Sequence, residues 1–253
     1  LPFPAAYDRR RFLSGVGVAA AGLFTTPGAF AEALASTPRQ TEGPFFPDKL
    51  PLDTDNDLII LNDSITPAVG EVTYLSGRIL GPNGAPIRGA TIEIWQCDAN
   101  GVYLHGGSFG GHEKQDKNFQ GYGRFLTASS GEYLFRTIKP VPYTGRTPHI
   151  HAKVRVNGRE LLTTQVYVKG QPGNDKDMLY NRLSDDKARQ SLTADFAPLA
   201  GAPVGVLAAR WDIVLGATPS DDEHSKHEHT PPERPRPRGP GLRNGSSPSA
   251  PQR

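Results

Sequence analysis

Short apolar segments separated by glycine and proline turns are the feature that most limits how this chain can fold. The segments alternate in polarity or are rich in β-branched and aromatic residues, and both patterns are typical of strands. The expected strands are Val72–Leu80, Ala90–Cys97, Gly131–Ile138, His149–Val156, Leu161–Val168 and Val206–Leu215. One short surface helix is expected over Asp175–Leu183. Many short strands without a repeating helix predict an all-β fold, a β-sandwich of antiparallel strands joined by long loops.

Composition divides the 253-residue chain into three parts, and the first is residues 1–35. Three arginines from Arg9 precede an uncharged apolar run over 15–24, and small residues typical of a cleavage site follow. The paired arginines resemble a twin-arginine signal, so we expect an exported protein, periplasmic or extracellular. The run is too short to span a bilayer, so no stable membrane insertion is expected. The alternative is an amphipathic helix of the folded domain, but the run lacks a polar face.

Residues 36–217 are expected to form the folded domain, and residues 218–253 a disordered tail. The tail is rich in Pro, Arg, Ser and Gly and has too few apolar residues to bury a core. Its three histidines could bind metal loosely, although we expect them to be solvated: His224, His227 and His229.

The net charge and the cysteine content argue against a nucleic-acid partner and against an intrachain disulfide. A net charge of +2 gives no sign of the concentrated basic face that nucleic-acid binding requires, so no such partner is expected. The single cysteine, Cys97, excludes an intrachain disulfide and is expected to be a small buried side chain in a strand.

The Pro-His-Ile-His motif over 148–151 is the strongest local indication of chemistry. Alternate residues of a strand share a face, so His149 and His151 can bind one metal from a single strand. By itself such a pair also occurs in zinc and copper sites and on plain surfaces. Tyr103 and Tyr143 add oxygen donors, and phenolate favours ferric iron over zinc or ferrous iron. Either tyrosine alone is more simply explained as a packing aromatic at a strand end.

Several sequence blocks, by their order and spacing, resemble the intradiol ring-cleavage dioxygenases, most closely the branch of the protocatechuate 3,4-dioxygenase β chain. The resemblance covers residues 37–215. The blocks that carry it are Gln40–Pro47, Gly77–Leu80, Ile94–Gln96, Gly101–His105, Phe135–Pro140, Arg146–His151, Thr164–Tyr167 and Trp211–Leu215.

The resemblance implies a ferric-iron enzyme that inserts both atoms of dioxygen into a catechol-type ring and gives a cis,cis-muconate-type product. Protocatechuate, catechol or a substituted catechol would be the small aromatic diol substrate. The implied iron ligands are Tyr103, Tyr143, His149 and His151.

The same resemblance implies three catalytic roles. Tyr143 would leave the iron when substrate binds and accept one catechol proton. Arg146 would stabilise negative charge on the bound catecholate, where a fixed guanidinium is well suited. Gln165 would lie near the side where oxygen binds.

The sequence departs from the better-known family members in two places. The stretch between Tyr143 and His149 is short, and Thr144 and Gly145 replace a longer loop with a tryptophan. A more open site is therefore expected. We also expect no long helical N-terminal region like that of the catechol 1,2-dioxygenase branch. A homo-oligomer is expected, with a second, related chain as the alternative.

Two other functions stay open at this point. The block Gly77–Ala90 also resembles transthyretin-like and carboxypeptidase-regulatory-like modules, so a non-catalytic β-sandwich binding module is one alternative. A zinc or copper protein is the other, with His105 or His112 as the third ligand beside the histidine pair.

The hairpin at Asn157-Gly158 determines which way Gln165 points. A two-residue loop would place Gln165 opposite Ile150, away from the histidines. A three-residue loop over 156–158, with Gly158 in the left-handed region, would place Gln165 opposite His149. We predict the three-residue loop.

Overall fold

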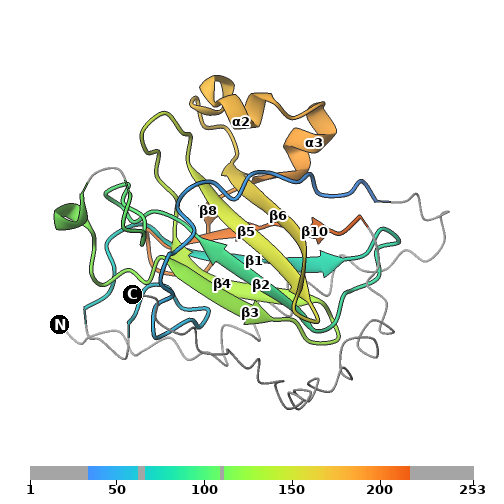
Figure 1. The fold of residues 1–253 in the computed structure, drawn as a ribbon, viewed down its shortest axis with the longest axis horizontal. Helices are drawn as coiled ribbons and strands as arrows, with labels where there is room; N and C mark the ends of the chain where they lie inside the picture. The colour runs from blue at the N-terminus through green and yellow to red at the C-terminus, as the bar shows by residue number, and fades with distance from the viewer. Residues whose placement is uncertain (1–33, 62–65, 109–110, 217–253) are drawn as a thin grey trace, which may run out of the picture. The chain divides into compact units, whose positions relative to one another are not determined.

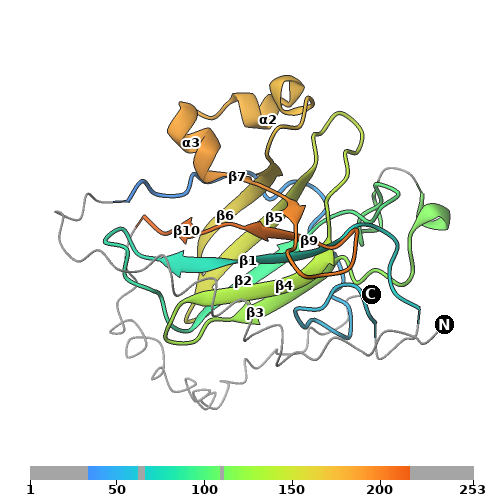
Figure 2. The same cartoon turned by 180° about the vertical axis from the view of Figure 1, so that it is seen from behind.

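The computed structural model describes residues 34–61, 66–108 and 111–216. In these residues the strands form two five-stranded sheets that pack into a sandwich, seen from opposite sides in Figures 1 and 2. The predicted β-sandwich is therefore confirmed. Three strand pairs are parallel, however, because segments far apart in the sequence lie side by side.

The first sheet is built around β1 (Val72–Leu80). Its antiparallel neighbour is β4 (Glu132–Ile138), and its parallel neighbours are β9 (Leu207–Arg210) and β10 (Ile213–Val214). The two-residue strand β8 (Ala197–Pro198) pairs with β9.

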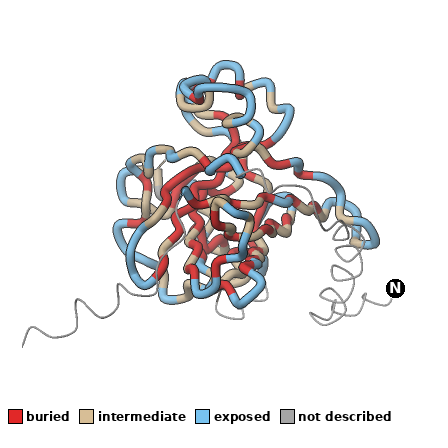
Figure 3. Tube along the Cα trace, turned by 90° about the vertical axis from the view of Figure 1, so that its right-hand side faces the viewer, coloured by how far each residue is buried: buried red, intermediate tan, exposed pale blue. Residues whose placement is uncertain are grey.

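The second sheet carries the candidate site. Its order is β3 (Tyr122–Leu126), β2 (Ala90–Trp95), β5 (His149–Val156), β6 (Arg159–Val168) and β7 (Thr193–Ala194). In the central strand β5, Ile150, Ala152 and Val154 belong to the apolar core between the sheets. The alternate residues of β5 point to the opposite face. That face is buried as well, and Figure 3 shows buried residues, in red, gathered in the interior of the described part of the chain.

Residues 37–47, here called the N-terminal strap, cover the outer face of β5 and β6. Gln40 N donates to the Thr163 carbonyl at 2.9 Å, and Thr164 Oγ1 donates to the Pro38 carbonyl at 2.7 Å. Glu42 of the strap pairs with Lys153 of β5 at 2.5 Å. The strap explains why β5 is buried on both faces.

The helical elements are short: η1 (His112–Lys114), η2 (Asn174–Lys176), α2 (Met178–Asn181) and α3 (Asp186–Ser191). The helix expected over Asp175–Leu183 is therefore a 3₁₀ turn followed by a single helical turn. Asp177 separates them, since its carboxylate accepts from Leu179 N and Tyr180 N as an N-cap.

The strand expected over Val206–Leu215 is interrupted, and this part of the prediction is wrong. At Trp211 the chain turns its carbonyl toward β1, where a Cβ added to Gly77 would lie 1.7 Å from Trp211 O. Tyr133 Oη donates to the same carbonyl at 2.5 Å. Trp211 N still donates to the Ser76 carbonyl at 2.8 Å, but the next acceptor along β1, for Arg78 N, is the Asp212 side chain at 2.9 Å.

The three-residue hairpin loop is also wrong, because Val156 pairs directly with Arg159. Asn157 (φ 51°) and Gly158 (φ 75°) both occupy the left-handed region, as a two-residue type I′ turn requires. The register then shifts between Val154 and Arg155, where β6 contains one extra residue. This bulge returns Gln165 to the histidine face, opposite His151 rather than His149.

Two expected parts of the chain lie outside the described residues: most of the signal segment 1–35, and the tail 218–253. Within the described residues, no helix has the length and apolar character needed to cross a membrane.

Candidate metal centre

Two buried histidines of β5 form the centre of the candidate site. His149 and His151 project to the same face and are each 1% exposed. Their Nε2 atoms lie 3.2 Å apart. Two imidazoles bound at a right angle to one metal, with bonds of about 2.1 Å, would bring these nitrogens to about 3 Å. The pair is therefore spaced as two adjacent ligands of one ion.

Both histidines are held neutral. Burial, assisted by the positive charge of Arg146, lowers the pKa of His149 to about 3. Burial and the neighbouring His149 lower the pKa of His151 well below its ordinary value. His149 Nδ1 lies 2.6 Å from the Thr147 carbonyl, to which it can only donate. Its Nε2 therefore carries the free lone pair that a metal needs.

The two candidate tyrosines approach this pair from loops. Tyr103 follows β2, and its hydroxyl lies 3.4 Å from His149 Nε2. Tyr143 packs edge-on against Tyr103 at 5.2 Å between ring centroids, and its ring lies 5.5 Å from that of His149. Burial raises the pKa of both phenols above the ordinary value, in Tyr103 with a further contribution from Tyr143. Ionisation of either phenol thus needs a nearby cation.

Arg146 is the fixed cation beside these groups. Its Nε donates to Asp177 at 2.8 Å, and its terminal nitrogen donates to Gln165 Oε1 at 2.7 Å. The same nitrogen lies 3.5 Å from the Tyr167 hydroxyl. Gln165 is fixed from its other end, since its Nε2 donates to the Thr41 carbonyl of the strap at 2.9 Å. The structure thus brings all the predicted site residues together: Tyr103, Tyr143, Arg146, His149, His151 and Gln165.

Comparison with known proteins identifies the family. A dioxygenase family profile matches residues 41–217. The protocatechuate 3,4-dioxygenase β chain of Burkholderia cepacia is 33% identical over 166 residues, which are 60% of this chain and 69% of that protein. This chain belongs to the intradiol ring-cleavage dioxygenase family.

Other dioxygenases agree in sequence or in fold. Catechol 1,2-dioxygenase 2 of Acinetobacter lwoffii is 29% identical over 154 residues, 54% of this chain and 52% of that protein. The chain spans about half the length of several such relatives. The dioxygenase domain of a carbohydrate-binding fusion protein from Streptomyces sp. SirexAA-E is 29% identical (TM-score 0.55), covering 73% of this chain and 100% of that one. An intradiol dioxygenase from Tetranychus urticae shares the fold at 20% identity (TM-score 0.57), covering 75% and 98%.

Sequence reasoning missed Asp177 as part of this candidate site. Its buried carboxylate binds Arg146, accepts from Thr147 N at 3.0 Å and also caps α2. The only local signal was its place before a helical turn, because the contact with Arg146 spans 31 residues.

Three aromatic residues also complete the site, and all lie inside the blocks that resemble the family. Phe45 stacks on Tyr103 at 5.1 Å, Trp95 stacks on His151 at 4.8 Å, and Tyr167 donates to Gln40 at 2.6 Å. The blocks therefore indicated these positions, although not their contacts.

A zinc or copper site with a third histidine finds no support. His105 packs edge-on against Phe45, and the side chain of His112 is outside the described set. Within the described part of the chain, no three His, Cys, Asp or Glu side chains gather as a metal-binding group. The oxygen atom that the structure places beside the pair is the Tyr103 hydroxyl, and the ring of Tyr143 packs against that of Tyr103.

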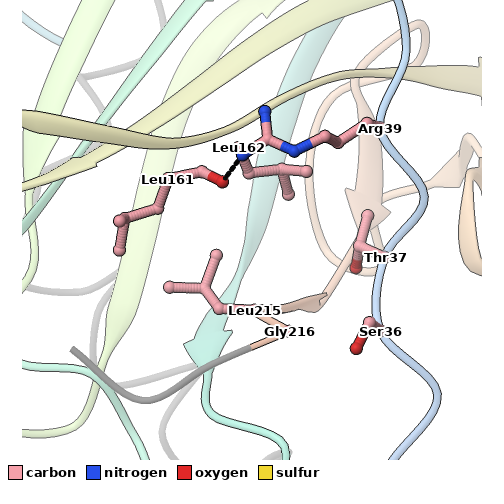
Figure 4. A pocket seen from close by; sticks show the side chains of 7 residues that line it. All are labelled: Ser36, Thr37, Arg39, Leu161, Leu162, Leu215 and Gly216. Carbon is pink, nitrogen blue, oxygen red and sulfur yellow. Dashed lines mark hydrogen bonds between the residues drawn. The ribbon is translucent and has the colours of Figure 1, made fainter.

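Figure 4 shows a cavity of about 360 Å³ that none of the candidate residues lines. Arg39 crosses it to donate to the Leu161 carbonyl. The remaining lining residues are Ser36, Thr37, Leu162, Leu215 and Gly216.

Proposed function

We propose that this chain is a ferric-iron intradiol dioxygenase that cleaves a small aromatic diol between its two hydroxyl-bearing carbons. The observation that carries the proposal is the convergence of two neutral imidazoles and two phenols beside one guanidinium. Tyr103, Tyr143, His149 and His151 would hold the iron. Phenolate oxygens are hard donors, so this set fits a ferric ion.

Bound there, ferric iron would supply Lewis acidity and a template for the catechol oxygens. The protein's own groups would do the rest. Tyr143 is partly exposed, and its Oη would accept a proton from a substrate hydroxyl. Arg146, fixed by Asp177 and Gln165, would hold a positive charge where the substrate becomes anionic.

The substrate is proposed as protocatechuate, catechol or a substituted catechol. The site is open on one side, which favours a substrate whose aromatic ring carries a further substituent. The turn at Tyr143–Arg146 is tight, Thr144 and Gly145 are exposed, and a Cβ added to Gly145 would meet no atom within 4 Å. A substituent directed toward this turn would therefore find little obstruction.

Visible absorption of the purified chain tests the proposal. Charge transfer from tyrosinate to ferric iron should give a broad red-brown band, and the substrate should shift it to longer wavelength under nitrogen. Tyr103→Phe should weaken the band, whereas Tyr74→Phe, remote from the site, should not. A colourless chain that takes up no iron would reject the enzyme and favour the transthyretin-like binding module.

We also propose export through residues 1–35, supported by the twin-arginine pattern. Replacement of Arg9 and Arg10 by lysine should retain the protein inside the cell, whereas an Arg159→Lys control should not. For the assembly we propose a homo-oligomer. Light scattering on the purified chain tests this, and ring cleavage only after addition of a related chain would contradict it.

A further inference from the structure

The two candidate histidine ligands are held in different ways. His149 has its Nδ1 fixed by the Thr147 carbonyl. His151 is equally buried, yet its Nδ1 has no hydrogen-bond partner among the described residues. A metal-bound histidine normally donates its second N–H to a carbonyl, a carboxylate or water. Among the described residues, no protein group fixes the orientation of the His151 ring through Nδ1.

The indole of Trp95 lies against that ring. The two ring centroids are 4.8 Å apart and the planes differ by only 11°, which is a stacked arrangement. Trp95 and His151 are direct partners in the register of β2 and β5, so neighbouring strands present both rings to the same face. Trp95 is fully buried, and its own Nε1 makes no hydrogen bond within the described chain. Its contribution is thus its flat face.

Trp95 is itself held by the N-terminal strap. Phe46 packs edge-on against the indole at 5.0 Å. The Lys153 ammonium lies 4.1 Å above the Phe46 ring and 5.7 Å from that of Trp95. Glu42 binds the same ammonium. The indole therefore cannot tilt unless the strap moves.

We propose that Trp95 is a positioning residue for His151, and that stacking replaces the usual hydrogen bond to Nδ1. This inference rests on the proposed iron site. The two imidazoles are then unequal ligands. The carbonyl contact makes His149 the more basic donor, whereas His151 is oriented without being polarised.

Two substitutions at Trp95 separate its flat face from its bulk. Trp95→Met retains an apolar side chain that can fill the space but removes the ring, and Trp95→Phe retains a ring. The matched control is Tyr122→Leu, because Tyr122 lies in the same aromatic cluster and packs on Phe46, and its hydroxyl donates to Glu93 rather than to the histidine pair. The readouts are iron loss to a chelator, the ferric EPR signal and the tyrosinate band.

Trp95→Met should lose iron about tenfold faster or more, the usual effect of removing a residue that orients a ligand. Its EPR signal should also change. Trp95→Phe should restore both properties most of the way, and Tyr122→Leu should resemble the wild type. Iron retention and EPR signal unchanged in a folded Trp95→Met variant would overturn the inference while leaving the proposed function intact. A wild-type chain that takes up no iron would instead overturn both.

If Trp95→Met does not fold, a crystal structure of the iron-loaded wild-type chain tests whether stacking or a hydrogen bond holds His151. Parallel rings with an unbonded Nδ1 would support the proposal. A water or carbonyl bonded to His151 Nδ1 would overturn it.

Discussion

Arg146 illustrates how much of the candidate site depends on one side chain's shape. Its guanidinium binds Asp177 and Gln165 from different nitrogens, which a lysine ammonium cannot do from a single point. We predict that Arg146→Lys lowers kcat about 100-fold, the usual cost of removing one preorganised charge donor. Iron content and the visible band should persist, because Arg146 is not proposed as a ligand.

Oxygen uptake with catechol, measured beside the absorption spectrum, checks this prediction. Arg155→Lys is the control, since Arg155 lies on the same face of β5 but pairs with Glu93. A wild-type rate in Arg146→Lys would remove Arg146 from the proposed mechanism.

Asp177 links the same site to acid stability. Burial alone would raise the pKa of its carboxyl. Hydrogen bonds from Tyr180 N, Arg146 and Thr147 N prevail and lower that pKa below the ordinary value of 3.8. The unfolded chain then binds the proton more readily. The stabilisation is present above about pH 4 and is lost as pH falls through the lowered pKa.

We therefore expect the unfolding free energy to decrease below about pH 4, by up to about 1.4 kcal/mol per pH unit from this group. The Asp177→Asn variant should not show this decrease with falling pH. At neutral pH its unfolding free energy should be about 3 kcal/mol lower than that of the wild type, because Arg146 keeps an unpaired charge. Urea unfolding between acid and neutral pH measures both effects. Asp175→Asn, an exposed neighbour, should behave as the wild type.

The residues of the site divide by how far apart their partners lie in the sequence. The period of two along a strand was enough to place His149 and His151 on one face, and the family resemblance added the tyrosines, Arg146 and Gln165. No local pattern could show that Arg146 meets Asp177, because that contact is decided by how η2 and α2 return over the sheet.

Among the elements, strands with clear alternation were predicted almost to the residue, and irregular ones were not. β1 and β5 have the expected bounds. β3 was missed because Tyr122-Gly-Arg-Phe-Leu126 contains a glycine and alternates poorly. The β6 bulge was not predictable either, since its extra residue is an ordinary strand former whose role appears only in the pairing.

The hairpin turn gives a test at this scale. Gly158 has φ +75°, and an added Cβ would meet no atom within 4 Å, so only backbone strain opposes a side chain there. We predict that Gly158→Ala destabilises the fold by about 1–2 kcal/mol. Asn157→Gly keeps the left-handed geometry and should change stability by less than about 0.5 kcal/mol.

Urea unfolding measures these values. The visible band of iron-loaded Gly158→Ala should match the wild type, because six residues of strand, about 20 Å, separate Asn157 from His151. A shifted band would mean that the β5–β6 register had slipped.

For the molecule as a whole, the N-terminal strap connects both sheets and closes the histidine face. Thr37 exchanges hydrogen bonds with Val214 of the first sheet, and Gln40 bonds to Thr163 of the second. These partners are more than 120 residues away in the sequence. The block Gln40–Pro47 was recognised by resemblance, but its position over β5 follows only from the tertiary structure.

The strap's pair Glu42–Lys153 provides the last prediction. The Lys153 side chain is 5% exposed and that of Glu42 is 42% exposed, with Glu160 as a more distant second carboxylate at 3.8 Å. Glu42→Gln should lower the unfolding free energy by about 1–2 kcal/mol. The loss is smaller than that for breaking a fully buried pair, because solvent screens Glu42. Lys153→Met removes the charge that needs a partner, so Glu42→Gln should cost almost nothing in that background. Urea unfolding of the four proteins gives the coupling free energy between Glu42 and Lys153.

The control is Glu132→Gln, from the more exposed pair with Arg78, which should change the unfolding free energy by less than about 1 kcal/mol. An equal cost of Glu42→Gln in both backgrounds would show that backbone and aromatic contacts alone hold the strap.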